Sequence, residues 1–344
     1  MRFLPDAEQA AFGRTLDRML TAAGTPAAVR AWARGDHGPG LALWARLAEA
    51  GVFALAAPEE YGGVGPLPVE LAVACLELGR HAVPGPVAET VAVTALLTRL
   101  AGTGDTAPAR EWLPRVCSGA ARVTLTLPEE SPYAVDADVC DAVFTVTKAP
   151  RPAGPDTLAL RLAPGTGPVQ PSLDRARPLA RPEGARPALA SGRAVRAAVA
   201  HAVDWAAFAV AAQALGVGLA LLERTVAYTK QRTQFGVAVG SFQAVKHRLA
   251  DTLVGLEFAR PLVHGAAVAL ASGGPGATAE VAAAKAAACD AAYAAARTAL
   301  QLHGAIGYTA ECDLSLWLGK ARALRSAWGT PTACRARALG LSFR

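Results

Sequence analysis

The sequence has little of three features that would each point to a particular class of protein. Its six cysteines lie more than twenty residues apart, which excludes CxxC-type metal or redox motifs. The net charge is +6, but the basic residues are scattered and do not form the dense run that binds along a nucleic-acid backbone. Charged residues interrupt its alanine-rich stretches, and none approaches the ~20 apolar residues of a membrane-spanning helix. We therefore expect no nucleic-acid partner and no membrane span.

The N-terminal segment also lacks the uninterrupted apolar core of a signal peptide. Asp6, Glu8 and Asp17 fall where that core would lie, so we expect a cytoplasmic protein. His247 and His303 have no second ligand at a metal-binding spacing, and we expect no metal site. With 52% apolar residues, the 344-residue chain has material for a large core and two or three domains.

Helical patterns fill the first third of the chain. Asp6 followed by Gln9 predicts a capping box, and LALWARLAEAG predicts a helix that stops at Gly51. After an irregular insert, a helix begins near Pro66–Pro68 with an inward stripe of Leu71, Ala74, Cys75 and Leu78. Another helix is predicted over residues 87–100.

The segment from Pro128 to Pro187 has a different character. It holds 11 of the 24 prolines and two short alternating pieces, VFTVTK and TLALRL. These pieces predict a small β region, and the alternative is a proline-rich linker.

Long helices return after residue 191. One runs through residues 201–230, and Ser241 is the predicted N-cap of the next, which ends at Gly273–Gly274. Further helices are predicted over 279–302 and 312–326, and Thr330–Pro331 begins a last one. Such helices with glycine-bounded turns form a bundle. The predicted protein is mainly α, with a helical domain at 1–118, a shortened β domain at 119–190 and a four-helix-bundle domain at 191–344.

Three segments resemble motifs of the acyl-CoA dehydrogenase family. They are LWARLAEAGVFALAAPEEYGG at 43–63, RTQFGV with SFQ at 232–243, and QLHGAIGYTAECDLSLWLGKAR at 301–322. The order of helical domain, β domain and helical bundle is also that of the family. The resemblance implies a flavoprotein that dehydrogenates acyl thioesters, either of coenzyme A or of an acyl carrier protein.

The resemblance also implies a flavin site built from the bundle domain. Arg232, Phe235 and Gln243 of one subunit, with Gln301 and Gly304 of a neighbour, would hold the FAD nucleotide across the interface of a dimer or tetramer. Thr330 would contact the flavin from a helix N-terminus, or is a plain N-cap. In isolation, Phe235 and Phe242 read as core aromatics and Arg232 as a surface cation.

The sequence departs from the family where a general base is needed to remove the α-proton. Trp328 stands at the family's usual glutamate position and Ala206 at its second one, and neither side chain accepts a proton. Asp204 is a weak substitute because it lies two residues before Ala206, which places it on roughly the opposite side of the helix. Glu311 and Asp313 are better explained as caps of the next helix. The β domain is also shortened, leaving Thr124–Leu127 for the family's flavin-facing strand.

Three hypotheses follow from this combination. In the first, the chain is a subunit of a hetero-oligomeric acyl-CoA dehydrogenase whose related partner supplies the base and shares the FAD site. In the second, it is an enzyme of altered chemistry in a biosynthetic pathway, with Asp204 acting. In the third, it is a cofactor-free scaffold subunit.

Overall fold

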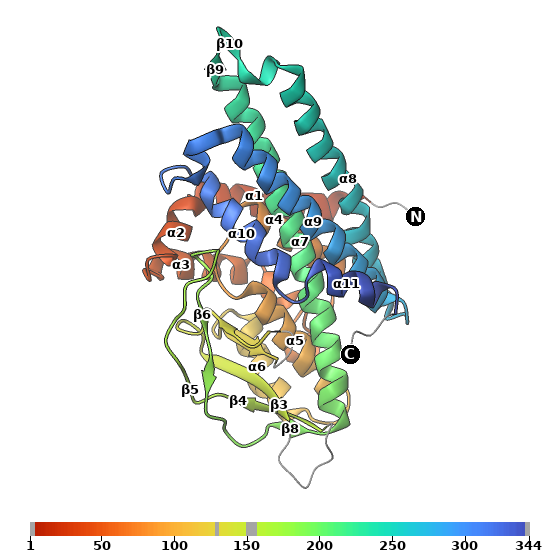
Figure 1. The fold of residues 1–344 in the computed structure, drawn as a ribbon. Helices are drawn as coiled ribbons and strands as arrows, with labels where there is room; N and C mark the ends of the chain where they lie inside the picture. Colours follow the sequence, from red (N-terminus) through yellow and green to blue (C-terminus); the bar gives the residue numbers. More distant parts are fainter. Residues whose placement is uncertain (1–3, 128–130, 149–156, 341–344) are drawn as a thin grey trace. The chain divides into compact units, whose positions relative to one another are not determined.

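The computed structural model describes residues 4–127, 131–148 and 157–340, and helices dominate it (Figure 1). The α-helices are α1 (Ala7–Ala22), α2 (Thr25–Trp32), α3 (Gly38–Glu49), α4 (Pro68–Arg80), α5 (Val87–Ala101), α6 (Ala107–Cys117), α7 (Arg193–Gln231), α8 (Gln243–Ser272), α9 (Ala277–His303), α10 (Leu314–Ser326) and α11 (Pro331–Ala338). The strands are β1 (Val123–Thr126), β2 (Ala134–Val135), β3 (Ala142–Lys148), β4 (Leu158–Leu162), β5 (Gly165–Thr166), β6 (Leu179–Ala180), β7 (Pro182–Glu183), β8 (Ala190–Ser191), β9 (Thr233–Gln234) and β10 (Val237–Ala238). Short 3₁₀ turns lie at Val52–Ala54, Glu59–Tyr61, Val239–Ser241 and Gly304–Tyr308.

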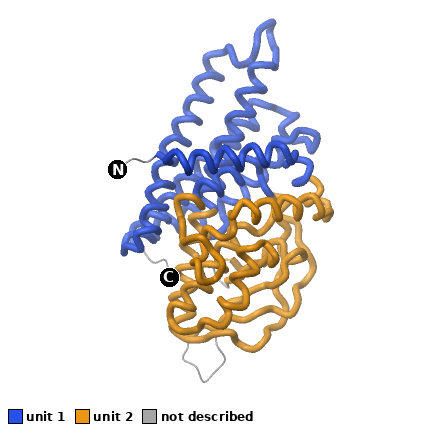
Figure 2. Tube along the Cα trace, turned by 180° about the vertical axis from the view of Figure 1, so that it is seen from behind, with its two compact units in different colours: residues 1–29, 72–83, 210–344 blue, residues 30–71, 84–209 orange. Residues whose placement is uncertain are grey.

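The chain forms two compact units (Figure 2). Unit 1 comprises residues 1–29, 72–83 and 210–344, and unit 2 comprises residues 30–71 and 84–209. Unit 1 thus combines α1 and most of α4 with the C-terminal helices. The predicted domain boundaries near residues 118 and 190 stay predictions.

Unit 2 contains the small β region that the sequence predicted. The two alternating pieces form β3 and β4, which pair antiparallel with Phe144 opposite Leu162. β1 joins the other edge of β3 in parallel and β8 pairs with β4, giving the order β1-β3-β4-β8. Phe144 is fully buried and packs edge-on against Trp112 of α6, with ring centroids 5.4 Å apart. The linker interpretation is therefore wrong, although Pro128 itself lies outside the described residues.

Unit 1 is held together by close helix packing. α8 packs along α9, which also packs against α10 and α11. α4 and α7 approach so closely that only glycine fits at their crossing. A Cβ at Gly79 would lie 2.0 Å from the carbonyl oxygen of Gln213, and one at Gly216 would lie 1.9 Å from that of Leu76. The predicted inward stripe of α4 is buried, with Leu71, Ala74, Cys75 and Leu78 each at most 2% exposed.

Most of the predicted helix ends are confirmed. Asp6 and Gln9 form the reciprocal capping box of α1, and Gly273 ends α8 with a φ of 63°. Ser241 is not the N-cap of α8: that position is Phe242, and the Ser241 hydroxyl donates to the Ala238 carbonyl instead. The reason is local competition, because a 3₁₀ turn at Val239–Ser241 takes up the serine before the helix begins.

Two helices are long and apolar enough to cross a membrane by length and composition alone. An 18-residue window of α7 is 94% buried within the protein, as expected of a core helix. The corresponding window of α8 is only 28% buried. The expectation that no stretch approaches membrane-spanning length was thus too strong for these two helices.

Candidate functional site

Arg232 and Phe235 lie in the hairpin that joins α7 to α8. Phe235 and Gly236 are the central residues between β9 and β10, with φ values of 53° and 80°, as in the turns that close two-residue hairpins. The Phe235 side chain is 93% exposed, so it is not a core aromatic. The Arg232 side chain is exposed and makes no hydrogen bond or ion pair with the residues that the structure describes. The hairpin therefore presents a bare aromatic ring close in sequence to an available guanidinium.

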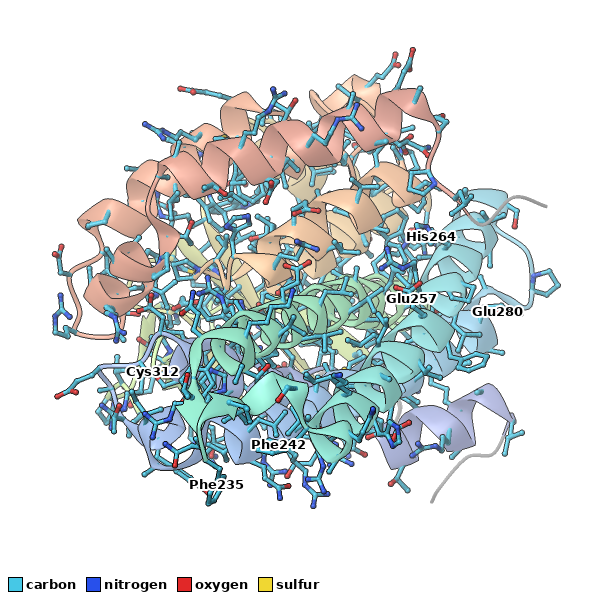
Figure 3. All side chains as sticks on the ribbon, turned by 90° about the horizontal axis from the view of Figure 1, so that it is seen from above. Phe235, Phe242, Glu257, His264, Glu280 and Cys312 are labelled. Carbon is cyan, nitrogen blue, oxygen red and sulfur yellow. The ribbon has the colours of Figure 1, made fainter. Side chains whose placement is uncertain are left out.

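Gln243 begins α8 directly after this hairpin. It is exposed, and the preceding Phe242 is 38% exposed. The rings of Phe235 and Phe242 meet edge-on with centroids 6.4 Å apart (Figure 3). These two aromatics form a small apolar surface of their own instead of joining the core, and Gln243 follows it with a free amide.

Gln301 and Gly304 lie at the end of α9. Gln301 accepts a hydrogen bond from the guanidinium of Arg248 on α8, a residue that the sequence analysis did not single out. Gly304 ends the helix with a φ of 64°. His303 is 8% exposed, and its Nδ1 lies 2.8 Å from the Ala299 carbonyl oxygen. Its ring stacks on that of Tyr228, with ring centroids 4.1 Å apart. Its contacts are those of a structural histidine, and burial lowers its pKa.

Trp328 and Thr330 lie in the turn between α10 and α11. Trp328 is 2% exposed and has a φ of 54°, a left-handed conformation that is unusual for a bulky residue. Thr330 is the N-cap of α11 and accepts a hydrogen bond from the Ala333 N–H at 3.2 Å. The fully buried Lys285 of α9 donates to the Gly329 carbonyl at 3.0 Å and to the Leu324 carbonyl at 3.1 Å. A buried ammonium thus fixes the shape of the turn that carries Trp328.

Ala206 and Asp204 both lie on the part of α7 that belongs to unit 2. Ala206 is fully buried and Asp204 is 8% exposed. His201, one turn earlier, has a lowered pKa because of burial first and the nearby Arg99 second, and Asp204 opposes this shift. Asp204 is therefore a buried carboxylate in a mixed-charge setting.

The interpretation of Asp313 as a side-chain cap needs adjustment, and Thr124 of the predicted flavin-facing strand makes a contact between two strands. Asp313 occupies the N-cap position of α10, but its side chain makes no capping hydrogen bond, because its backbone is already helical there. In β1, the Thr124 hydroxyl accepts from the Val135 N–H at 3.2 Å, so this threonine ties β1 to β2.

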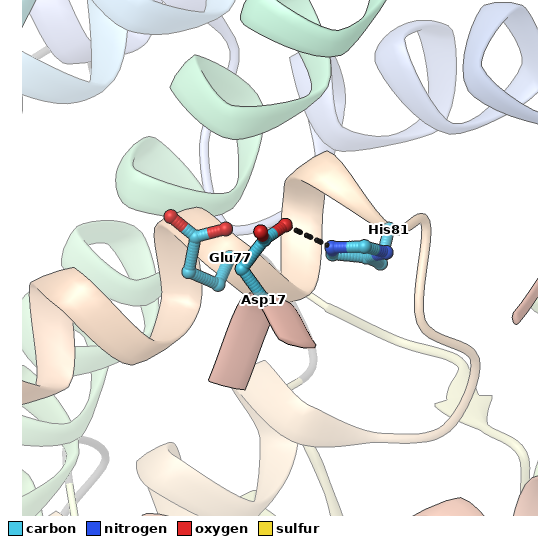
Figure 4. Close-up of side chains that lie close together, drawn as sticks. All are labelled: Asp17, Glu77 and His81. Carbon is cyan, nitrogen blue, oxygen red and sulfur yellow. Dashed lines mark hydrogen bonds and ion pairs between the residues drawn. The ribbon is translucent and has the colours of Figure 1, made fainter. Parts of the chain in front are cut away.

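Three side chains that the sequence analysis did not connect meet in unit 1. Asp17 of α1, Glu77 of α4 and His81 have oxygen and nitrogen atoms within 4.8 Å of one another (Figure 4). Asp17 Oδ1 lies 2.8 Å from His81 Nε2, and Glu77 Oε2 lies 3.5 Å from Arg80 Nε. The carboxyl groups of Asp17 and Glu77 thus lie beside an imidazole and a guanidinium, respectively. Because sixty residues separate Asp17 from Glu77, no spacing pattern in the sequence could have revealed them.

Comparisons with known proteins place the chain in a family. Residues 193–336 match the acyl-CoA dehydrogenase C-terminal domain and residues 6–120 match the N-terminal domain. The chain is 35% identical to acyl-CoA dehydrogenase IpdE2 of Mycobacterium tuberculosis over 327 residues, covering 92% of each protein.

Two solved structures share the fold over nearly the whole chain. One is a Tcur3481–Tcur3483 steroid acyl-CoA dehydrogenase variant, with 25% identity, a TM-score of 0.82 and 97% of each chain covered. The other is the ChsE4–ChsE5 complex from Mycobacterium tuberculosis, with 24% identity, a TM-score of 0.81 and 100% of each chain covered. The chain therefore belongs to the acyl-CoA dehydrogenase family, a family of flavin-dependent oxidoreductases that act on CH–CH bonds.

Proposed function

We propose that this chain is a subunit of a hetero-oligomeric acyl-CoA dehydrogenase that contributes the nucleotide-binding half of an FAD site, while a related partner contributes the catalytic base. The observation that carries the proposal is a contrast within the chain. Arg232, Phe235 and Gln243 stand exposed, whereas Trp328 and Ala206 occupy the two positions where the resemblance places the family's carboxylates.

The exposed residues fit the nucleotide part of FAD. A pyrophosphate needs a cation that is not already paired, and the Arg232 guanidinium meets this condition among the described residues. An aromatic side chain that is 93% exposed, as Phe235 is, has most of its apolar surface available to a ligand or a neighbouring subunit. Gln301 and Gly304 would complete the contact from the other subunit, with Arg248 orienting the Gln301 amide.

The apolar face of α8 supports assembly with a partner. Leu253, Val254, Phe258 and Leu262 are 45%, 51%, 74% and 38% exposed, and three of them repeat every fourth residue. A stripe of this kind on a helix that starts at the proposed nucleotide site is typical of a subunit interface. We call these four residues the α8 apolar face.

The proposed division of labour follows from the side chains. When bound, FAD takes up the hydride that leaves the β-carbon of an acyl thioester. Arg232 would hold the pyrophosphate, and Thr330 would present its hydroxyl and the N-terminus of α11 to the flavin. Trp328 lacks any proton acceptor, so the α-proton would pass to a carboxylate of the partner subunit.

The substrate is proposed as a coenzyme A or carrier-protein thioester with a bulky, ring-containing acyl group. The relative with a solved structure at 25% identity is described as a steroid acyl-CoA dehydrogenase, and its name joins two gene products. The ChsE4–ChsE5 structure is likewise a complex of two different proteins. We transfer both features, the substrate class and the mixed assembly, to this chain as part of the proposal.

The test is the flavin content of the chain co-purified with any related dehydrogenase subunit that is encoded beside it. Arg232→Gln should lower the bound FAD per complex at least tenfold at limiting FAD, because a charge-assisted contact to the pyrophosphate contributes roughly 1.5–3 kcal/mol. Arg110→Gln, at an exposed position on α6, is the matched control and should retain FAD.

Two results would contradict the proposal. Equal FAD content in the Arg232→Gln and Arg110→Gln complexes would remove Arg232 from the site. Dehydrogenation of an acyl thioester by a homo-oligomer of this chain alone would show that no partner carboxylate is needed.

A further inference from the structure

A pocket of about 350 Å³ lies within unit 1, between α1, α4, α7 and α8. Its size falls within the range of small-molecule sites, which span roughly 300–1,000 Å³. Its apolar wall includes Ala72, Val73 and Leu76 of α4 with Leu215 of α7 and Val263 of α8. None of these residues belongs to the proposed flavin half-site.

The polar wall of the pocket contains hydrogen-bonding groups that the chain leaves unsatisfied. The Arg14 guanidinium of α1 is exposed and has no protein partner among the described residues, so it is not one of the buried groups. On α8, Arg260 pairs with Glu257 through Nη2, but its buried Nε–H has no hydrogen-bond acceptor. Glu77 Oε2 is also buried without a hydrogen bond, since Arg80 Nε approaches it only to 3.5 Å. Buried polar groups without partners are rare in native proteins and call for an explanation.

The charges around the pocket come from every helix that lines it. They are Arg14 and Asp17 on α1, Glu77 and Arg80 on α4, His81 just after α4, Glu223 on α7, and Arg260 and His264 on α8. Arg80 is already paired with Glu223 at 2.8 Å, and Asp17 with His81 at 2.8 Å. Among the described residues, Arg14 and the Nε of Arg260 are guanidinium donors that remain without a protein acceptor.

Burial shifts the pKa of two titratable groups of the pocket, Glu77 and His264. Burial raises the pKa of Glu77 to about 7, with Arg80 opposing the shift and Asp17 and Glu223 adding to it. Burial first, and Arg260 second, lower the pKa of His264, so the imidazole is neutral at pH 7. Figure 3 shows His264 and Glu257 on α8. Below neutrality the Glu77 carboxyl is therefore protonated. A protonated carboxyl can donate a hydrogen bond to an anion, whereas an ionised carboxylate would repel the anion.

We propose that this pocket is a second ligand site, which binds a small carboxylate with a short apolar body between Arg14, Arg260 and Glu77. The carboxylate accepts hydrogen bonds from donors that otherwise have no acceptor, and the apolar body lies against Val73, Leu76 and Val263. At ~30 Å³ per water-sized group, the pocket holds roughly ten non-hydrogen atoms. A ligand of this size corresponds to a six- to eight-carbon acid.

A cation fits the same place less well. Guanidiniums from three different helices line the pocket, and Asp17, one of the carboxylates that could bind a metal, already lies 2.8 Å from His81 Nε2. The unsatisfied Arg260 Nε is a donor, which a cation cannot satisfy.

The proposal is tested with hexanoate as the probe and hexanamide as its uncharged match, by calorimetry or ligand-observed NMR. The protein is used as purified, with any subunit and flavin that it carries. Hexanoate should bind with a dissociation constant of roughly a millimolar or below, given the ligand efficiency of small molecules, and hexanamide at least fivefold more weakly. Arg14→Gln should weaken hexanoate binding at least fivefold. Arg18→Gln, one turn further along α1 and outside the pocket, should leave it unchanged.

The pH dependence separates this pocket from any other hexanoate site. Between about pH 6 and about pH 8 the dissociation constant should rise roughly tenfold as Glu77 ionises, and in Glu77→Gln it should stay nearly constant. Equal binding by the Arg14→Gln and Arg18→Gln proteins, equal affinity for hexanamide, or an unaltered pH profile in Glu77→Gln would each overturn the proposal. Because the readout involves neither FAD nor turnover, its result is independent of the proposed dehydrogenase function.

Discussion

Replacing Lys285 with methionine tests whether a buried ammonium builds the turn that carries Trp328. Lys285 is fully buried, and its ammonium donates to the carbonyls of Leu324, Arg325 and Gly329 at 3.1, 3.4 and 3.0 Å. Methionine keeps most of the volume and removes all three donors. The carbonyls of Leu324, Arg325 and Gly329 then lose their donor, and at roughly 1–3 kcal/mol for each buried acceptor left unsatisfied the total cost is about 3–5 kcal/mol.

The expected result is a thermal midpoint lower by roughly 6–10 °C, taking ~2 °C per kcal/mol for a chain of this size. Lys230→Met, at an exposed position near the end of α7, is the control and should change stability by less than ~0.5 kcal/mol. Differential scanning calorimetry measures both. A Lys285→Met protein as stable as the Lys230→Met protein would refute the assignment of the ammonium as the support of this turn.

Three further predictions concern the interface, the pocket and a helix cap. Phe258→Ala should raise the dissociation constant of the subunit complex roughly tenfold or more, since it removes an anchor with ~1.5–3 kcal/mol of burial energy. Leu173→Ala, at a 70% exposed leucine in unit 2, should leave the dissociation constant unchanged. Sedimentation velocity measures both complexes, and equal effects would exclude the α8 apolar face as the interface. Because burial raises the folded-state pKa of Glu77 from 4.5 to about 7, the folded state binds more protons than the unfolded state between these pH values. Stability should therefore fall as pH rises through this window. Glu77→Gln should flatten this part of a plot of urea midpoint against pH, and an unchanged slope would contradict the raised pKa. Thr330→Ala should destabilise α11 by ~1 kcal/mol and Thr330→Ser by much less, as calorimetry would detect, unless the cap is dispensable.

Features fixed by neighbouring residues were predictable from the sequence. The capping box of Asp6 and Gln9, the stripe of α4 and the cap at Thr330 depend on residues within one or two turns, and all three are present. Two short helices were missed because their local sequence signals are weak. α2 has only 8 residues, and α6 contains Pro114 within its 11 residues, which a sequence pattern reads as a break.

Features that depend on distant residues were predictable only through resemblance, or not at all. The motif around Arg232 and Phe235 predicted a nucleotide site through the family resemblance, whereas its residue types alone favoured a buried Phe235, which is 93% exposed. The meeting of Asp17, Glu77 and Arg260 requires α1, α4 and α8 to pack together. Nothing in the spacing of these residues encodes that packing, so only the structure reveals the pocket.

The central claim is that FAD binding needs both this chain and a related partner. The most direct measurement is the visible absorption spectrum of the chain purified alone, compared with that of the chain co-purified with any related dehydrogenase subunit that is encoded beside it. We predict flavin bands in the complex and none in the chain alone. Flavin bands of full stoichiometry in the lone chain, or no flavin in either sample, would contradict a shared site.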